Sequence, residues 1–409
     1  MNNLDAFYGL PKEVKFCKKC VISNQRPSST VEFKSERNEK KTVINFNEND
    51  ICSACTYQEE KESGIDWGVR EDKLEKLLSK FRKSDGSYDV IVPGSGGKDS
   101  AYTSHILKYK YGMNPLTVTW APHLYTDIGW KNMQEWMHTG GLDNILYTPN
   151  GILHREMTRN AFHNLLHPFQ PFIVGQRIIG PAMAKKFGVK LVMYGENQAE
   201  YGNAIEENTN PIMNMDFFSS DDILNMKFGG IAMKDYIKTG KYSVKDFTPY
   251  IAPQKNDLIE AGIEVHYLGY YLKWDPQECF YYAVENTGFQ ANPIRTEGTY
   301  SKYSSIDDKI DPFHYFTTLI KFGIGRCTYD AAQEVRNGKI TREEAVYLVG
   351  KYDSEFPKIY FNEFLKYIDT SEIEFWNTVD KFRSPHLWGK DVEGNWKLRH
   401  NVMKSGLDD

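Results

Sequence analysis

Pro93-Gly94-Ser95-Gly96-Gly97-Lys98-Asp99-Ser100 directly follows the apolar run at 88–92, and this stretch decides the fold. The apolar run predicts a buried strand, and the residues from Ala101 onward predict a helix. Three closely spaced glycines let the backbone turn tightly and bring amide N–H groups close to a ligand, while the helix adds its partial positive N-terminal charge. The stretch therefore predicts a phosphate cradle between a strand and a helix.

The order of residues in this loop separates it from a Walker loop, in which a lysine is followed at once by serine or threonine. Here Asp99 stands between Lys98 and Ser100. The loop resembles the SGGxDS signature of the PP-loop ATP pyrophosphatases, and that resemblance implies cleavage of ATP between its α and β phosphates. A plain Gly/Ser turn between a strand and a helix is the alternative, and the run of consecutive matching positions disfavours it.

Composition and charge favour a protein that acts on small molecules. The chain has 409 residues, of which 40% are hydrophobic, enough for more than one packed unit. Its 50 basic and 55 acidic side chains give a formal charge of -5, so we expect no nucleic-acid partner. No apolar stretch approaches a membrane span, which predicts no membrane insertion, and residues 1–5 lack the features of a secretion signal. We therefore expect a cytoplasmic protein.

Four of the six cysteines form two Cys-x-x-Cys pairs, Cys17 with Cys20 and Cys52 with Cys55. In a chain without a secretion signal this pattern favours a thiolate zinc site over disulfides, and an iron–sulfur cluster is the main alternative. Four thiolates leave no open position for a substrate, so the metal is expected to stabilise a small N-terminal module. The long segment between the pairs is expected to form a hairpin of its own.

Alternating strand and helix patterns continue beyond the glycine-rich loop. They predict strands at 115–120, 144–147 and 190–194 and helices at 101–111, 130–138, 154–166 and 174–187. This alternation is typical of an α/β, doubly wound parallel sheet that binds ligands beyond the carboxyl ends of its strands. We expect three units: the four-cysteine zinc module with a helix at 1–87, the ATP-binding α/β domain at 88–291, and a mainly helical region at 292–409 that covers the substrate.

Polar loops are expected at the carboxyl ends of these strands. One lies at 120–132 and contains His123 and Tyr125, and another lies at 195–203 and is rich in carboxylates and amides. Taken singly, each of these residues is explained equally well as a solvated loop side chain, and only their clustering favours a binding site. Basic side chains beside glycines at 297–303 and 321–327 are expected to form a second wall around the phosphates. Thr341 and Glu344 predict a helix capping box.

The Cys pairs, the glycine-rich loop and the segments at 126–132, 195–202 and 321–326 occur together in this order, and the chain resembles the N-acetyl sugar amidotransferases. This family of PP-loop enzymes makes acetamidino sugars for bacterial lipopolysaccharides or flagellar glycans. The resemblance implies an ATP-dependent ligase that adenylates the amide oxygen of an acetamido group on a sugar or sugar nucleotide. Ammonia then replaces the oxygen, and AMP and pyrophosphate are released.

The resemblance and this chemistry together assign roles to particular residues. The catalytic candidates are Lys98, Asp99, Glu196, Glu200, Lys321 and Arg326. ATP is expected to contact Ser95, Gly96, Gly97, Lys98, Asp99, Ser100, Thr119 and Gly195. The substrate is expected to contact Asp127, Asn132, Asn197, Tyr201 and Lys302. Mg²⁺ is expected to accompany ATP, and Asp99 is expected either to hold that ion or to cap the helix.

Ammonia is expected from a separate class I glutamine amidotransferase, as the resemblance implies. Cys279 and Cys327 lack the flanking glycines of a glutaminase nucleophile, which agrees with a separate source. Two other functions stay open. One is a PP-loop tRNA-thiolating enzyme, which the negative charge disfavours, and the other is a nucleotide-binding module without turnover.

Overall fold

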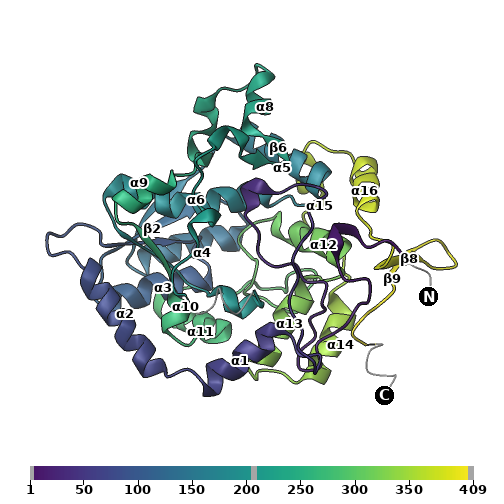
Figure 1. Ribbon diagram of the computed structural model, residues 1–409, viewed down its shortest axis with the longest axis horizontal. Coiled ribbons are helices and arrows are strands. Elements are labelled where there is room, and N and C mark those ends of the chain that lie inside the picture. Colours follow the sequence, from purple (N-terminus) through teal and green to yellow (C-terminus); the bar gives the residue numbers. More distant parts are fainter. Residues whose placement is uncertain (1–3, 204–209, 404–409) are drawn as a thin grey trace.

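The computed structural model describes residues 4–203 and 210–403, and its centre is one parallel sheet (Figure 1). Residues 1–3, which belong to the segment considered for a secretion signal, lie outside the described residues. The strands are β1 (Val90–Pro93), β2 (Pro115–Trp120), β3 (Asp143–Tyr147), β4 (Leu191–Tyr194) and β7 (Glu264–Tyr267), in the order β3-β2-β1-β4-β7. Every neighbouring pair is parallel. The predicted α/β fold with a parallel sheet is confirmed.

The chain crosses from one side of β1 to the other between β3 and β4. Val90 pairs with Pro115 of β2 on one side, and Ile91 pairs with Val192 of β4 on the other. The loops that leave β1 and β4 therefore diverge at a topological switch point, the place where open α/β sheets bind ligands. The glycine-rich loop follows β1, so the topology places it at this point.

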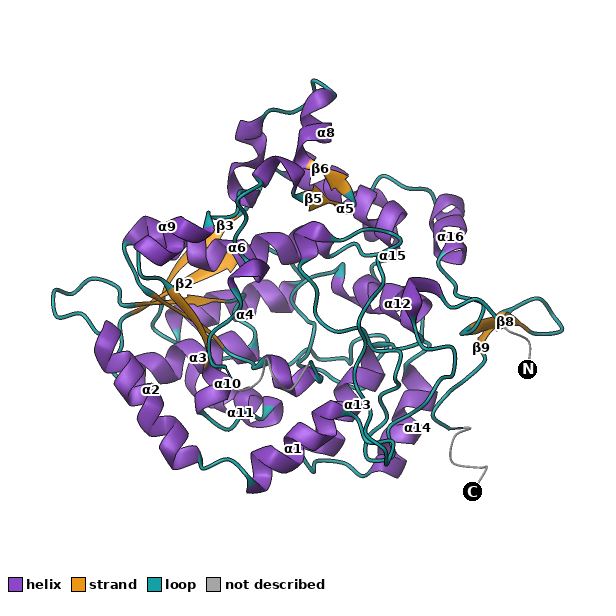
Figure 2. Ribbon diagram, viewed as in Figure 1, coloured by secondary structure: helices purple, strands orange, loops and turns teal. Residues whose placement is uncertain are grey.

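Helices cover both faces of the sheet, as the ribbon coloured by secondary structure shows (Figure 2). The helix α6 packs against β1, β2 and β4 on one face, and α3 packs against the same strands with α11 behind it. The four residues of β1 and the six of β2 are all buried, which agrees with the apolar sequence of β1 and with the β-branched and apolar residues of β2. The α-helices are α1 (Ser53–Ser63), α2 (Trp67–Phe81), α3 (Lys98–Tyr109), α4 (Asp127–His138), α5 (Gly151–Leu165), α6 (Gln170–Phe187), α8 (Met233–Lys238), α9 (Lys255–Glu260), α10 (Leu268–Tyr271), α11 (Pro276–Thr287), α12 (Asp311–Phe322), α13 (Arg326–Arg336), α14 (Arg342–Tyr352), α15 (Phe361–Tyr367) and α16 (Glu372–Lys381).

Smaller elements lie around this framework. Short 3₁₀ helices are η1 (Phe7–Gly9), η2 (Glu32–Lys34), η3 (Gln198–Tyr201), η4 (Met215–Phe217), η5 (Ile223–Asn225) and η6 (Val244–Tyr250). Two antiparallel pairs join β5 (Lys227–Phe228) to β6 (Ile231–Ala232) and β8 (Trp388–Lys390) to β9 (Trp396–Leu398). No helix in the described ranges is long and apolar enough to span a membrane.

The N-terminal segment lies across the C-terminal helices (Figure 1). Its four cysteines share one buried apolar cluster with Ile324, Ala331 and Ala345 of the C-terminal region. Instead of the expected hairpin strands, the segment between the cysteine pairs has an isolated antiparallel bridge between Pro27 and Val43. The mainly helical C-terminal region is confirmed by α12 to α16, and the predicted capping box of Thr341 and Glu344 is present at the start of α14. The boundaries of the three expected units stay predictions.

Candidate active site

The glycine-rich loop is shaped by close approaches that exclude side chains. A Cβ atom on Gly94 would lie 2.1 Å from the Cβ of Ser100. Gly96 has a φ of +82°, and a Cβ there would lie 2.9 Å from the Cα of Met133. Both contacts are closer than real Cβ atoms permit, so the tight path between β1 and α3 requires glycine at these positions.

The amino end of α3 is left available to a ligand. The residue before the helix is Gly97, and no side chain caps this end in the described chain. The hydroxyl of Ser100 turns back and donates to the carbonyl of Gly97 at 3.1 Å. The unpaired backbone N–H groups and the positive end of the helix dipole together favour an anion such as phosphate.

A cavity of about 530 Å³ lies against this loop. Its walls come from five parts of the chain: the N-terminal segment, the glycine-rich loop with α4, the start of α6, the loop after β4, and the C-terminal region from α11 onward. The predicted site residues that line it are Ser95, Gly96, Gly97, Lys98, Asp99, Asn132, Glu196, Tyr201 and Arg326. The loop after β1, the loop after β4 and the start of α13 therefore meet at one cavity.

Lys98 and Asp99 form an ion pair at the cradle, with 2.6 Å between Nζ and Oδ2. Burial lowers the pKa of Lys98, but the carboxylates of Asp99 and Glu196 outweigh this effect and hold the pKa above its usual value. The other oxygen of Asp99, Oδ1, is buried without a hydrogen-bond partner. Asp99 does not cap α3, so of its two expected roles only the cation-binding one agrees with its contacts.

Glu196 lies on the loop after β4 and lines the cavity. Burial raises its pKa to about 8, and the charge of Asp99 acts in the same direction while Lys98 opposes it. The hydroxyl of Tyr201 donates to Oε2 of Glu196. A carboxyl group with a pKa near neutrality can exchange a proton with a reacting group at physiological pH.

Three aspartates of the segment 307–311 line the same cavity, and no sequence pattern singled them out. Asp308 accepts hydrogen bonds from the backbone N–H and the ring Nδ1 of His123, both at 2.7 Å, and so ties the segment after β2 to the C-terminal region. Burial raises the pKa of Asp311 to about 7 and also raises the pKa of Asp307. The sequence shows these carboxylates, but nothing in their spacing distinguishes them from ordinary loop residues.

Arg326 begins α13 and reaches the cavity as predicted. Its Nε atom donates to Asp330 one turn later at 3.1 Å, and its guanidinium lies over the ring of Tyr315, 4.4 Å from the centroid. These contacts hold the side chain in one orientation. Asn132 also lines the cavity, but its amide exchanges two hydrogen bonds with the backbone of Gln290, at 2.9 and 2.8 Å, and so holds a wall in place.

Three predicted residues lie away from the cavity with other partners. Glu200 is 3% exposed and forms a buried ion pair with Lys61 of α1, with 2.9 Å between the charged atoms. Lys321 is buried and donates to the carbonyl of Leu165 at 3.1 Å, and burial lowers its pKa to about 7. Lys302 is exposed and donates to the carbonyl of Pro293 at 3.0 Å. The structure therefore does not bring these three side chains to the phosphate cradle.

The remaining five predicted residues lie outside the cavity lining. Ser100 binds the carbonyl of Gly97 in the loop, and Thr119 is buried in β2, where it accepts a hydrogen bond from Asn144 at 3.0 Å. The carbonyl of Gly195 accepts from the N–H of Gly269 at 2.8 Å. Asn197 caps η3, and Asp127 is exposed in the first turn of α4. None of these five predicted residues is among the cavity-lining residues of the described chain.

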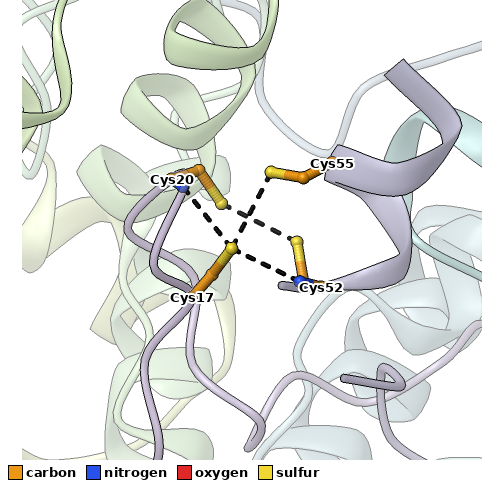
Figure 3. Close-up of side chains that lie close together, drawn as sticks. All are labelled: Cys17, Cys20, Cys52 and Cys55. Carbon is orange, nitrogen blue, oxygen red and sulfur yellow. Dashed lines mark hydrogen bonds between the residues drawn. The ribbon is translucent and has the colours of Figure 1, made fainter. Parts of the chain in front are cut away.

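The four N-terminal cysteines converge on one buried site (Figure 3). Their sulfur atoms all lie within 4.8 Å of one another, and the distances from Cys17 to Cys55 and from Cys20 to Cys52 are 3.8 Å. The backbone N–H groups of Cys20 and Cys52 donate to the sulfur of Cys17 at 3.5 and 3.3 Å. The predicted four-cysteine site is confirmed as a group that can hold a metal.

The segment that carries the four cysteines, residues 17–55, also forms part of the cavity wall. Ile22 and Arg26, between the two cysteine pairs, line the cavity together with Ile44 and Ala54. Arg342 of α14 donates to the carbonyls of Cys20 and Cys17 at 3.2 and 3.3 Å, which fixes the first pair against the C-terminal helices. The four-cysteine site therefore positions residues of the cavity as well as the N-terminal segment itself.

The fold and the site define an α/β protein with a glycine-rich cradle at the switch point of its parallel sheet and a four-cysteine site near its N-terminus. Residues 297–403 match the family of the C-terminal domain of WbpG-like LPS biosynthesis proteins. A stretch of 78 residues, 19% of this chain, is 33% identical to an uncharacterized protein of Methanocaldococcus jannaschii. The match spans 27% of that relative's length.

Three solved structures are similar to parts of the chain at low identity. An NMN synthetase from Francisella tularensis is 13% identical, with a TM-score of 0.29 over 75% of this chain and 98% of its own. An NH3-dependent NAD synthetase from Campylobacter jejuni is 13% identical, with a TM-score of 0.27 over 72% of this chain and 99% of its own. The U34-tRNA thiolase NcsA from Methanococcus maripaludis is 12% identical, with a TM-score of 0.30 over 77% of this chain and 88% of its own. These scores are too low to define a shared fold.

Proposed function

We propose that the protein is an ATP-dependent amidotransferase that converts an acetamido group on a sugar or sugar nucleotide into an acetamidino group. The observation that carries this proposal is the meeting of the phosphate cradle at 95–99 and the perturbed carboxyl of Glu196 at one cavity of about 530 Å³. The match of residues 297–403 to the WbpG-like LPS biosynthesis family supports a substrate from surface-glycan synthesis.

The first step activates the amide. Its oxygen attacks the α-phosphorus of ATP, the bond from that phosphorus to the β-phosphate oxygen breaks, and pyrophosphate leaves as the amide nitrogen loses its proton. Free N–H groups at the start of α3 and the ammonium of Lys98 would stabilise the negative charge that develops on the phosphates. Each charge-assisted hydrogen bond of this kind contributes about 1.5 to 3 kcal/mol.

The residues of the cradle also fit the divalent cation that accompanies ATP. Oδ1 of Asp99 is buried without a partner, and the carboxyl of Glu196 lies in the same cavity. Carboxylate oxygens are the protein ligands that Mg²⁺ prefers. Such an ion neutralises phosphate charge when it is bound, and Asp99 would hold it beside the cradle while its other oxygen binds Lys98.

The second step forms the amidine. Ammonia attacks the imidate carbon, the bond from that carbon to the adenylyl oxygen breaks, and AMP leaves with the oxygen. Before that bond breaks, the ammonium nitrogen of the tetrahedral intermediate must lose a proton, since ammonia would otherwise be expelled again. Glu196 in its carboxylate form would accept this proton and return it to the imidate nitrogen, so that the product is an amidinium cation. Tyr201 binds this carboxyl and would keep it oriented toward the reacting centre.

Ammonia would come from a separate class I glutamine amidotransferase. Cys279 and Cys327 are 2% and 0% exposed and lie inside α11 and α13, where neither can act as an accessible glutaminase nucleophile. The purified protein should therefore use ammonium salts and not glutamine. Efficient use of glutamine by the protein alone would contradict this part of the proposal.

Zinc is the proposed metal of the four-cysteine site. Thiolates about 2.3 Å from a central zinc at tetrahedral angles lie about 3.8 Å apart, which agrees with the two measured sulfur–sulfur distances of 3.8 Å. A four-iron cluster binds each thiolate to a different iron and so requires more widely separated sulfurs. Elemental analysis of the purified protein checks this assignment.

The experiment that tests the function combines a phosphate assay with mass spectrometry. The protein is incubated with ATP, Mg²⁺, ammonium and a panel of acetamido sugars and sugar nucleotides. Pyrophosphate should appear only with the correct sugar, whose mass should fall by about 1 Da because NH replaces O at the activated carbon. Lys98→Ala should abolish both signals, whereas Lys302→Ala, which removes an exposed lysine, should not. Release of orthophosphate, or turnover only with tRNA, would overturn the proposal.

A further inference from the structure

Arg26 brings a buried positive charge from the metal-binding segment to the wall of the cavity. It lies between the two cysteine pairs in the sequence, is 7% exposed, and lines the same cavity as the glycine-rich loop. A guanidinium buried to this extent normally has a carboxylate or several carbonyls around it, because removing a charge from water is costly.

Arg26 has neither kind of partner among the described residues. Its Nη1 atom is buried without a hydrogen-bond partner, and its guanidinium lies 5.9 Å from the ring centroids of Tyr201 and Tyr329. Three other basic groups of the cavity are paired with carboxylates: Lys98 with Asp99, Arg326 with Asp330, and Lys339 with Asp275. Arg26, with neither a carboxylate nor a carbonyl partner among the described residues, therefore leaves its charge for a ligand.

We propose that Arg26 forms an anion subsite for a carboxylate or phosphate group carried by the sugar substrate. This inference rests on the proposed function, because it concerns the second substrate of the same cavity. The planar fork of an arginine donates two parallel hydrogen bonds to either anion. Arg336 lines the cavity too, and its Nη2 donates to the carbonyl of Glu200 at 3.0 Å, so its charge would reinforce the subsite.

Charge compensation of the metal site is the competing explanation for a buried arginine at this position. A zinc ion with four thiolates carries a net negative charge, and Cys52 is one of the groups that interact electrostatically with Arg26. Compensation acts through the total charge alone, so a lysine would serve as well. An anion subsite also requires the forked hydrogen bonds, so a lysine would serve only in part.

Titration calorimetry with defined probes tests the subsite. The probes are N-acetylglucosamine, its 1-phosphate and its 6-carboxylate (uronic acid) form, each added to metal-loaded protein with a non-hydrolysable ATP analogue. We expect at least one anionic probe to bind roughly 10 to 100 times more tightly than the neutral sugar. The two anionic probes distinguish a phosphate from a carboxylate. Arg26→Met should remove this preference, and Arg26→Lys should restore only part of it.

Controls separate the subsite from the fold and from the proposed function. Arg159→Met removes an exposed arginine that pairs with Asp369 and should leave the preference unchanged. Metal content and affinity for the ATP analogue should stay at wild-type values in Arg26→Lys. Equal binding of the neutral and anionic probes to the wild type, or full restoration by lysine, would overturn the subsite. The pyrophosphate assay on wild-type protein tests the proposed function separately, since anion preference can be present without turnover and turnover without anion preference.

Discussion

At the scale of single residues, Glu196 decides how the proposed chemistry depends on pH. Burial raises its pKa to about 8, whereas an exposed glutamate is ionised well below neutrality. Because the carboxylate is the form that accepts a proton, kcat should rise with pH up to about 8 and level off above it. Glu196→Gln should lower kcat by roughly 10² to 10⁴ and remove this limb of the profile. Steady-state rates from pH 6 to 9.5 check both effects.

Asp311 provides the matched comparison for that prediction. It lines the same cavity, and burial raises its pKa to about 7, so its titration could also shape the profile. Asp311→Asn should leave the limb near pH 8 in place. If instead Asp311→Asn removes the limb and Glu196→Gln keeps it, the proton acceptor is Asp311 and not Glu196.

Substitution of Gly96 tests whether ATP binding depends on the path of the backbone through the cradle. Gly96→Ala places a Cβ 2.9 Å from the Cα of Met133 at a φ of +82°, so the loop must move away from α4. We expect the affinity for ATP to fall at least tenfold, as measured by calorimetry. Gly86→Ala is the control, because Gly86 has a similar φ of +80° with no neighbouring atom within 4 Å. It should lose about 1 kcal/mol of stability and keep its affinity for ATP.

At the scale of secondary-structure elements, one buried ion pair joins the metal-binding segment to the loop after β4. Lys61 of α1 and Glu200 of η3 are 1% and 3% exposed, and Lys61 also donates to the carbonyl of Trp274. Lys61→Met leaves the carboxylate buried without its cation, so the free energy of unfolding should fall by about 3 to 5 kcal/mol. Urea denaturation followed by circular dichroism measures this loss.

The pair of Lys19 and Glu59 serves as the exposed counterpart. Both side chains are about half exposed, and such pairs contribute about 0 to 1 kcal/mol, so Lys19→Met should have little effect. A second check is Lys61→Met combined with Glu200→Met, which removes both charges and should recover part of the stability. A loss of less than about 1 kcal/mol in Lys61→Met would contradict a stabilising role for the buried pair.

The sequence predicted the elements around the cradle well because their apolar patterns are strong. The strand predicted at 115–120 is β2, and the helix predicted at 174–187 lies within α6. The strand β7 (Glu264–Tyr267) was not predicted, since a four-residue strand with a glutamate and a histidine shows no clear alternation. The predicted helices at 101–111 and 130–138 begin later in the sequence than the observed α3 and α4. Polar residues such as Lys98 and Asp127 occupy the first turns of these helices and hide the apolar pattern there.

The site was predictable where local motifs define it and unpredictable where distant segments meet. Residues 95–99 and Glu196 line the cavity, and the four cysteines converge on one site, and the sequence pointed to them because each lies in a motif or at a strand end. Their catalytic and binding roles stay predictions. Glu200 was selected for the same reason, but its partner Lys61 is far away in the sequence. Arg26 and the aspartates at 307–311 reach the cavity through long-range packing, which a single sequence does not reveal.

At the scale of the whole molecule, the cavity forms where the N-terminal segment, the sheet and the C-terminal helices meet. The N-terminal segment supplies Arg26, and α13 supplies Arg326 and Arg336, while the sheet supplies the cradle. The four cysteines and the C-terminal helices share one apolar cluster, so the metal site is part of the packing that closes the cavity. Loss of the metal should therefore weaken the binding of the sugar more than the binding of ATP at the cradle between β1 and α3.

Removal of the metal tests this coupling. Binding of a structural zinc contributes apparent folding free energy on the order of 10 kcal/mol, so dialysis against a strong chelator or Cys52→Ser should unfold the N-terminal segment. Because Arg26 then leaves the cavity wall, the tighter binding of anionic acetamido sugars should be lost while the ATP analogue keeps most of its affinity. Cys279→Ala, which changes a buried cysteine outside the four-cysteine site, should retain one metal per chain and bind both ligands. Unchanged sugar binding by metal-free protein would show that the metal site and the cavity are independent.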